Sequence, residues 1–234
     1  MTDLTGRVAL VTGANRGLGA AFVAELLERG AAKVYAAARR PETVAVTDPR
    51  VVPLELDVTD ADSIRRAAEA APDVTVLVNN AGIGVNQSLV TGDLEQIHRE
   101  FDTNFWGPVL VTRAFAPGIA DNGGGAIVNM HSALSWYAVG SYSATKAALW
   151  SASNSTRVEL APQGIQVVGV HVGYVDTEMA ADAEGYKVPP AQVVTEALDT
   201  VAAGGAEAIV GETAQRVKSV LHEDVRALYP QLAR

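Results

Sequence analysis

The sequence predicts an α/β fold in which a doubly wound, mostly parallel sheet of about seven strands carries helices on both faces. Short apolar runs rich in β-branched residues alternate with longer helical patterns along the chain. The runs are almost continuously apolar, which is typical of strands buried on both faces of a parallel sheet. This alternation predicts right-handed β-α-β crossovers.

The elements follow in chain order. Strands are expected at 8–12, 33–37, 51–56, 74–78, 126–130, 165–170 and 207–211. Helices are expected at 17–30, 60–71, 93–120, 141–162 and 191–203, followed by a final helix. No linker, charge block or repeat divides the chain, so residues 1–234 are expected to form a single domain, with the irregular stretch 178–190 as a substrate loop.

Composition narrows the class of protein. The chain of 234 residues is 48% hydrophobic and 19% charged, which excludes a disordered protein. Its net charge of −9 makes nucleic acid an unsuitable general partner. The lack of cysteine excludes disulfides and thiolate chemistry, and no metal site is predicted. No stretch approaches the roughly 20 apolar residues that cross a bilayer, so we expect a cytoplasmic protein without a membrane partner.

A glycine-rich turn joins the first strand to the first helix. Its pattern is G-x-x-x-G-x-G, and glycines allow close backbone approach while the helix start offers free N–H groups. This combination suits the pyrophosphate of a dinucleotide, although a tight turn without a ligand is the alternative. The residues predicted to hold the cofactor here are Thr12, Gly13, Asn15, Arg16, Gly17, Leu18 and Gly19.

The end of the second strand indicates which dinucleotide is bound. NAD-selective folds place an acid there, whereas this strand ends in Arg39 and Arg40. Arg16 lies in the glycine turn and could reach the same region. Guanidinium groups bind a 2′-phosphate with paired donors, which favours NADP(H) over NAD(H). The alternative is that these arginines are solvated loop charges.

Tyr142 and Lys146 lie four residues apart in a predicted helix, so both project from the same face. A free phenol has a pKa of about 10, and a nearby positive charge stabilises the phenolate and lowers that pKa. The pair could therefore move a proton near neutral pH. By itself the spacing is weak evidence, because it also arises by chance in exposed helices.

Taken together, these motifs resemble the short-chain dehydrogenase/reductase family in its compact, single-domain Rossmann form. The glycine turn, Asn79-Asn80-Ala81-Gly82, Ser132 and Tyr142-x-x-x-Lys146 match in order and spacing. Asn104 stands where the family has its helix asparagine. The resemblance is close over about residues 4–180 and looser beyond them.

The resemblance implies a catalytic role for four residues. Tyr142 would give a proton to a substrate carbonyl oxygen or accept one from an alcohol, and Ser132 would hydrogen-bond that oxygen. Lys146 would hold the nicotinamide ribose and lower the Tyr142 pKa. Asn104 would hold a water that links Lys146 to solvent. Hydride would then move between the nicotinamide and the carbonyl carbon.

The resemblance also implies further cofactor contacts. Asp57 and Val58 would lie beside the adenine, and Val175 and Thr177 beside the nicotinamide carboxamide. The remaining cofactor contacts that it implies are Asn80, Ala81, Gly82, Tyr142 and Lys146. One departure stands out, because Val172 replaces the family's common proline and leaves the shape of the following loop uncertain.

The substrate and the assembly follow less directly. Apolar and aromatic residues flank the catalytic groups and predict a small hydrophobic ketone or secondary alcohol, reduced in preference to being oxidised. The candidate pocket residues are Ile83, Leu134, Trp136, Tyr137, Val139 and Tyr174. The segments 93–120 and 141–162 match helices through which family members pair, which implies a homodimer or homotetramer.

Two other functions stay open at this point. A catalytically silent nucleotide-binding regulator or scaffold could keep the same fold, although such proteins usually lose the tyrosine, lysine or glycines. A lyase or epimerase would normally need an added substrate domain, for which 234 residues leave little room. His131 and His171 are interpreted as structural residues, because both lie in or beside predicted strands.

Overall fold

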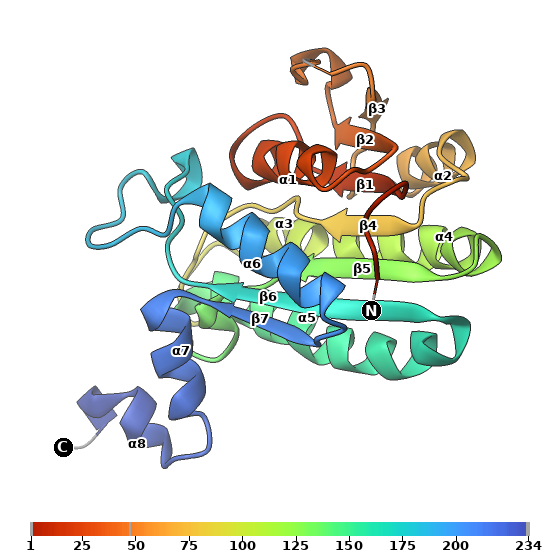
Figure 1. Cartoon of the computed structure of the whole chain (residues 1–234). Helices are drawn as coiled ribbons and strands as arrows, with labels where there is room; N and C mark the ends of the chain where they lie inside the picture. Colours follow the sequence, from red (N-terminus) through yellow and green to blue (C-terminus); the bar gives the residue numbers. More distant parts are fainter. Residues whose placement is uncertain (1, 47, 233–234) are drawn as a thin grey trace.

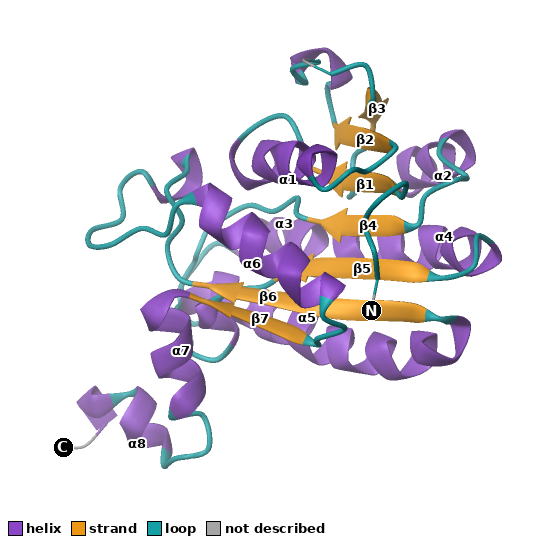
Figure 2. Ribbon diagram, viewed as in Figure 1, coloured by secondary structure: helices purple, strands orange, loops and turns teal. Residues whose placement is uncertain are grey.

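All seven strands form one parallel sheet in the order β3-β2-β1-β4-β5-β6-β7 (Figures 1 and 2). The structure is a computed structural model that describes residues 2–46 and 48–232. The strands are β1 (Val8–Thr12), β2 (Lys33–Ala38), β3 (Val51–Glu55), β4 (Val76–Asn79), β5 (Gly125–Met130), β6 (Ile165–Val172) and β7 (Glu207–Val210). The predicted doubly wound sheet is therefore confirmed.

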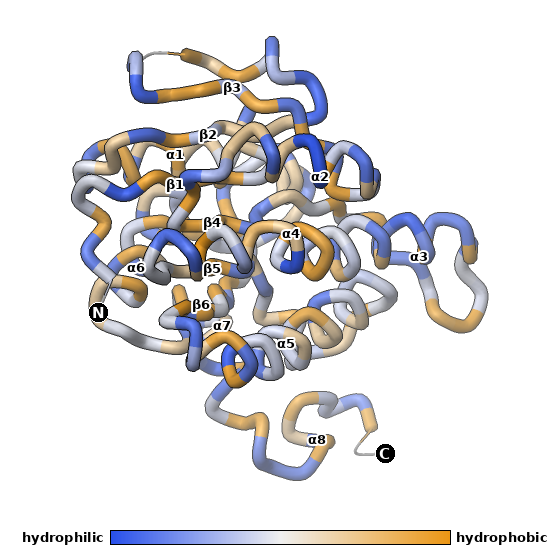
Figure 3. Tube along the Cα trace, turned by 90° about the vertical axis from the view of Figure 1, so that its right-hand side faces the viewer, coloured by the Kyte–Doolittle hydropathy of each residue, from blue (hydrophilic) through white to orange (hydrophobic). Residues whose placement is uncertain are grey.

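Helices cover both faces of the sheet, as the side view in Figure 3 shows. The helices are α1 (Gly17–Glu28), α2 (Ala61–Ala70), α3 (Leu94–Phe101), α4 (Gly107–Asp121), α5 (Gly140–Leu160), α6 (Pro190–Ala202), α7 (Gly211–Ser219) and α8 (Val225–Leu228). On one face α1 and α6 bury Phe22, Leu26 and Leu198 against the strands. On the other face α2 and α4 bury Ile64, Phe115 and Ile119. Each fully buried side chain of this size contributes about 1.5–3 kcal/mol of transfer free energy.

The chain order places a crevice at the centre of the sheet. β1 pairs with β2 on one side and with β4 on the other. The crossovers after β1 and β4 therefore leave in opposite directions, and their loops separate at the carboxyl ends of these strands. Ligands bind at such switch points in open α/β sheets.

Two helical regions differ from the expected pattern. The helix expected at 93–120 is continuous but includes a π-helical turn, η2 (Asp102–Trp106), between α3 and α4. Such turns are found mostly at functional sites, and no sequence period announces them. The final helix is divided into α7 and α8. None of the helices described between residues 2 and 232 is long and apolar enough to span a membrane.

Candidate active site

The glycine turn after β1 is shaped for close approach by a ligand. Gly13 and Gly17 have φ values of +65° and +54°, a region that L side chains rarely adopt. A Cβ on Gly19 would lie 2.1 Å from the Gly13 carbonyl oxygen, so only glycine fits there. The first turn of α1 carries no acidic residue and no side-chain cap. Its free N–H groups therefore suit the pyrophosphate of a dinucleotide.

A hydrogen-bonded clasp joins the ends of β1 and β4 beside this turn. The Thr12 hydroxyl accepts from the backbone N–H groups of Asn80 (2.9 Å) and Ala81 (3.0 Å). The Asn80 amide donates in return to the Thr12 carbonyl at 2.8 Å. A Cβ on Gly82 would lie 3.2 Å from Asn104 Oδ1 and 3.9 Å from Lys146 Nζ. The segment 80–82 thus connects the cofactor turn with the catalytic side chains.

The predicted adenine and phosphate contacts lie at the ends of β2 and β3. Asp57 Oδ1 accepts from both the backbone and the hydroxyl of Thr59, while Val58 is buried against Gly107. Arg39 is exposed just beyond β2. Arg16 is also exposed, and it forms an ion pair with Glu178, which belongs to the loop after β6. Both guanidinium groups are accessible to an anionic ligand.

Tyr142 and Lys146 occupy the first two turns of α5, as predicted. Lys146 is buried, and its Nζ donates to the Met130 carbonyl at 2.8 Å and lies 5.6 Å from the centre of the Tyr142 ring. Burial lowers the pKa of Lys146 to about 8, an effect that the negative charge of Glu100 partly opposes. The ammonium therefore titrates close to physiological pH.

The expectation that Lys146 lowers the pKa of Tyr142 is wrong for this arrangement of side chains. Burial of the phenol, followed by the negative charge of Glu100, raises the pKa of Tyr142 well above its usual value. The reason is local geometry, since the Lys146 ammonium is directed to a backbone carbonyl. The phenol therefore keeps its proton near neutral pH, and its role as a proton donor stays a prediction.

Ser132 follows β5 and is buried at the start of a short 3-10 turn, η3 (Ala133–Ser135). Its hydroxyl accepts from Leu134 N–H at 3.1 Å and lies 3.4 Å from the Val172 carbonyl, to which it donates. The residue is thus both a cap for η3 and a hydroxyl at the carboxyl end of β5. Its contact with a substrate oxygen stays a prediction.

Asn104 is fully buried within the π-helical turn η2. Its Oδ1 accepts from Ile83 N–H at 2.9 Å, and its Nδ2 donates to the Ile83 carbonyl at 2.8 Å and to Thr145 Oγ1 at 3.3 Å. The side-chain amide therefore holds the segment after β4 against α5. The side-chain amide of Asn104 is thus bonded to protein groups. The role of Asn104 in holding a water stays a prediction.

The loop after β6 reaches both sides of the crevice. A bridge between Val175 and Val188, with Asp176 N–H donating to the Val188 carbonyl at 3.0 Å, closes its base. The Thr177 side chain lies beside Gly17 of the cofactor turn. A Cβ on Gly84 would lie 3.8 Å from the side chain of Met179. The predicted substrate loop thus spans the glycine turn and the segment after β4.

The candidate pocket residues are not equivalent. Ile83, Leu134 and Tyr137 are partly buried, whereas Val139 and Tyr174 are exposed. Trp136 is buried instead, with its ring stacked 3.9 Å from that of His171. Its indole belongs to the packed interior.

Sequence comparison identifies the family. The short chain dehydrogenase family profile matches residues 7–186. The chain belongs to the short-chain dehydrogenase family. Two curated relatives from Schizosaccharomyces pombe are an uncharacterized oxidoreductase, 32% identical over 186 residues, and an NADPH-dependent 1-acyldihydroxyacetone phosphate reductase, 33% identical over 183 residues. These matches cover 76% and 74% of this chain but only 63% and 61% of the relatives.

Solved short-chain dehydrogenase structures agree with the fold. A short chain dehydrogenase from Burkholderia cenocepacia in complex with NADP is 39% identical, with 99% of each chain covered and a TM-score of 0.93. The NADPH-bound carbonyl reductase from chicken fatty liver is 28% identical, with a TM-score of 0.77 over 84% of this chain and 91% of that chain.

A buried aromatic and ionic cluster behind Ser132 was not predicted as a unit. His171 Nδ1 lies 3.3 Å from the Ser132 carbonyl, and its Nε2 lies 3.5 Å from Glu207 Oε1. Glu207 also accepts from the Trp150 indole (2.8 Å) and from Lys218 (2.9 Å). Burial lowers the pKa of His171 despite Glu207, while the His171 and Lys218 contacts hold the pKa of Glu207 far below its usual value. The cluster joins β7 and α7 to the Ser132 turn, which agrees with a structural role for His171.

The sequence did not predict the contacts of Tyr229 and Glu100, because each joins distant parts of this short-chain dehydrogenase. Tyr229 stacks on Tyr137 at 5.1 Å and accepts a hydrogen bond from Ala138 N–H at 2.5 Å, so the C-terminal segment braces the loop after η3. Glu100 is fully buried beside Tyr142. No local motif distinguishes either residue from an ordinary surface tyrosine or glutamate.

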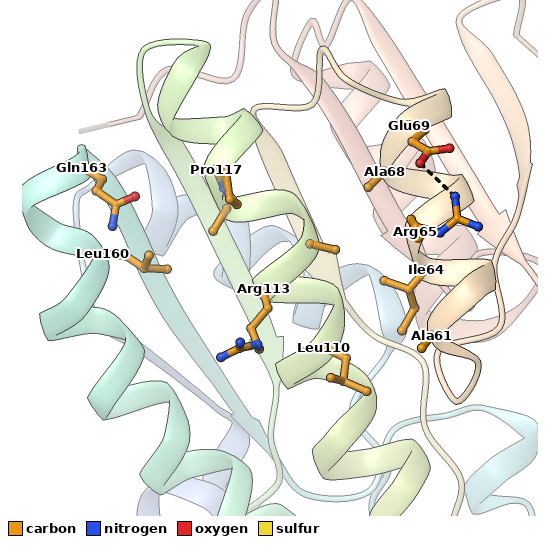
Figure 4. Close-up of a pocket in the computed structure, with 12 residues that line it drawn as sticks. Ala61, Ile64, Arg65, Ala68, Glu69, Leu110, Arg113, Pro117, Leu160 and Gln163 are labelled. Carbon is orange, nitrogen blue, oxygen red and sulfur yellow. Dashed lines mark hydrogen bonds and ion pairs between the residues drawn. The ribbon is translucent and has the colours of Figure 1, made fainter.

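A groove of about 780 Å³ lies away from these groups, between α2, α4 and the end of α5 (Figure 4). Its labelled lining includes Ile64, Leu110, Pro117 and Leu160, and an ion pair between Arg65 and Glu69 lies at its edge. None of the predicted catalytic residues lines it. The groove is therefore separate from the candidate active site.

Proposed function

We propose that this protein is an NADP(H)-dependent oxidoreductase that transfers hydride between the nicotinamide and a carbonyl or secondary alcohol, acting mainly as a carbonyl reductase. The observation that carries the cofactor assignment is the exposed Arg39, which follows β2 where an NAD-selective site would place a carboxylate; Arg16 of the glycine turn, also exposed, would add a second guanidinium group on releasing Glu178. A 2′-phosphate would give these charges a bidentate partner. The NADP complex of the Burkholderia cenocepacia relative supports the same choice.

The residues of this chain would divide the work between binding and proton transfer. The turn from Thr12 to Gly19 would hold the pyrophosphate, Asp57 and Val58 the adenine, and the segment 80–82 the central part of the dinucleotide. Val175 and Thr177 would lie at the nicotinamide. When bound, NADPH supplies the hydride.

The catalytic side would handle the proton on the substrate oxygen. Tyr142, whose phenol is protonated near neutral pH, would donate that proton, and the Ser132 hydroxyl would hydrogen-bond the oxygen as negative charge develops. The Lys146 ammonium would hold the ribose of the cofactor. Asn104 would keep the segment after β4 in place and take part in proton supply.

The substrate is proposed to be a small, uncharged, hydrophobic ketone. Ile83, Leu134 and Tyr137 present apolar surface next to the catalytic groups, and the loop 178–190 would cover the bound substrate. Tyr174 and Met179 are exposed on or beside this loop and would add to the apolar wall. A homodimer or homotetramer is proposed through the faces of η2, α4 and α5, where Trp106, Leu110 and Val158 are exposed.

The test is a comparison of cofactors with a graded panel of ketones, following the absorbance of the reduced nicotinamide. We expect turnover with a kcat/KM for NADPH at least about tenfold above that for NADH, equivalent to about 1.4 kcal/mol. Equal or greater use of NADH would overturn the cofactor assignment. Tight NADPH binding with no turnover of any carbonyl would instead support the regulator or scaffold.

A further inference from the structure

Glu100, near the end of α3, is a fully buried carboxylate that the proposed chemistry does not use. It lies four residues before Asn104 in a continuous helical stretch, so both side chains project from nearly the same face. Burial of a carboxylate costs several kcal/mol unless donors surround it. Its partners therefore indicate what the residue is for.

Three donors from two segments meet at this carboxylate. Oε1 accepts from the backbone N–H groups of Val85 (2.6 Å) and Asn86 (3.0 Å), and Oε2 accepts from the Ser141 hydroxyl (2.5 Å). Asn104 bonds both backbone groups of Ile83. The side chains of Glu100 and Asn104 thus bond backbone groups of residues 83–86, as the backbone of a neighbouring strand would do.

The segment held in this way is conformationally strained and tightly packed. Among the described residues, Asn86 is the only one other than glycine with a positive φ, at +54°. A Cβ on Gly140 would lie 2.6 Å from Asn86 Oδ1. Gln87 and Ser141 exchange two further bonds, Gln87 N–H to Ser141 Oγ (2.8 Å) and Ser141 N–H to the Gln87 carbonyl (2.9 Å). The residue next to Ser141 is Tyr142.

The charge of Glu100 also acts on the two titrating groups of α5. Its negative charge adds to the effect of burial on Tyr142, whose pKa rises, and opposes the effect of burial on Lys146, whose pKa falls. Among the described residues, Glu100 is the one charged group that shifts the pKa of either residue. Burial lowers the pKa of His131, the residue that follows β5.

We propose that Glu100 is a positioning residue of the catalytic site, which locks residues 83–87 to the first turn of α5. As a second consequence, its negative charge favours the ammonium form of Lys146 and so opposes the effect of burial on that residue. The proposal rests on the proposed reductase function for its kinetic consequences. Its structural part does not depend on that function.

The kinetic test compares Glu100→Gln with Ser141→Ala and with Glu95→Gln, a control at an exposed position of the same helix. Glu100→Gln keeps an acceptor for Val85 and Asn86 but loses the charge. We expect kcat/KM for NADPH in ketone reduction to fall by about tenfold at about pH 8, because loss of the Glu100 charge favours the neutral amine of Lys146. The basic limb of the pH profile should move to lower pH.

The other two variants separate charge from hydrogen bonding. Ser141→Ala should reduce kcat by about threefold and leave the basic limb in place, because the Glu100 charge remains. Glu95→Gln should match the wild type. A Glu100→Gln enzyme with wild-type kcat/KM for NADPH and an unmoved basic limb would overturn the proposed effect of the charge.

Hydrogen exchange tests the positioning part without any catalytic assay. In Glu100→Ala the amides of Val85 and Asn86 should exchange at least about tenfold faster, while those of β1 keep their rates. Should Glu100→Ala fail to fold, Ser141→Ala provides the same readout at the amide of Gln87. Unchanged exchange at these amides would overturn the positioning role. A wild-type protein without reductase activity but with this exchange pattern would refute the proposed function and leave the positioning role supported.

Discussion

The cofactor side and the catalytic side of the crevice are built on opposite principles. On the cofactor side the charged groups are in solvent, and the side chain of Arg16 is 70% exposed. On the catalytic side Ser132, Asn104 and Lys146 are buried, and Lys146 is only 5% exposed. The cofactor side relies on the backbone geometry of glycines and on accessible charges. The catalytic side relies on buried polar side chains that are hydrogen-bonded to their neighbours.

This difference has a physical reason. A guanidinium kept in water costs no desolvation and can still bind an anionic cofactor with two donors. Burial brings the pKa of Lys146 to about 8, close to neutral pH, and raises that of Tyr142, so the two groups respond to loss of water in opposite directions. The same crevice therefore separates affinity for the cofactor from control of the proton.

Loss of the phenol hydroxyl should produce the largest effect on the catalytic side. In Tyr142→Phe we expect kcat to fall by about three orders of magnitude, because the proton donor is lost. The Kd for NADPH, measured by fluorescence titration, should stay within about twofold of wild type, since the glycine turn is intact. Near-normal turnover by this variant would contradict the assignment of Tyr142 as proton donor.

Ser132→Ala should have the next largest effect. If the Ser132 hydroxyl binds the developing oxyanion as proposed, its removal should lower kcat by about a hundredfold. Ser135→Ala provides a control, because that serine completes the cap of η3 without a predicted role in chemistry. If both variants lost activity equally, the effect would belong to the turn and not to the Ser132 hydroxyl.

The cofactor side is tested by Arg39→Ala. Loss of one charged pair with a 2′-phosphate should lower the ratio of kcat/KM for NADPH to that for NADH by about tenfold. Arg65→Ala, on the exposed surface of α2, is the matched control and should leave the ratio unchanged. The loss should shrink at high salt, because the contact is screened. An unchanged ratio in Arg39→Ala would show that Arg39 does not read the phosphate.

The pH dependence of kcat/KM for NADPH tests the lowered pKa of Lys146. Its pKa of about 8 means that the ammonium is present below pH 8 and is lost above it. The kcat/KM for NADPH should therefore fall above about pH 8, by up to tenfold per pH unit. In Lys146→Arg, whose side chain stays charged, this limb should disappear even if the overall rate is lower. A wild-type profile that is flat to about pH 10 would refute the lowered pKa.

The smallest expected effect concerns stability. Burial lowers the folded-state pKa of His131 and His171, whereas both titrate near pH 6.5 in the unfolded chain. The unfolded chain therefore binds more protons below that pH, and the free energy of unfolding should fall by about 1 kcal/mol per pH unit for each histidine. Denaturant unfolding of His131→Gln should show a shallower slope than the wild type. His98→Gln, at an exposed position, should keep it.

The segments 93–120 and 141–162, predicted to pair in an oligomer, illustrate a limit of inference from the sequence. Their apolar residues Phe105, Val109 and Ala148 are partly buried, whereas Leu149 is 2% exposed and belongs to the interior. The large apolar residues that these segments expose are Leu94, Trp106, Leu110 and Val158. Helical spacing alone could not separate the two groups, because the core face and an interface face are equally apolar.

The sequence by itself determined the succession of strands and helices along the chain and the glycine turn. It also determined the arginines after β2 and the Tyr142–Lys146 pair. These features are local, since they depend on side-chain period, on backbone freedom at glycine and on short spacings. Only the tertiary structure decided that Glu100 bonds Ser141 beside Tyr142, that Glu178 pairs with Arg16 and that burial raises the Tyr142 pKa. Burial and charge arise from residues far apart in the chain, so only the folded arrangement brings them together.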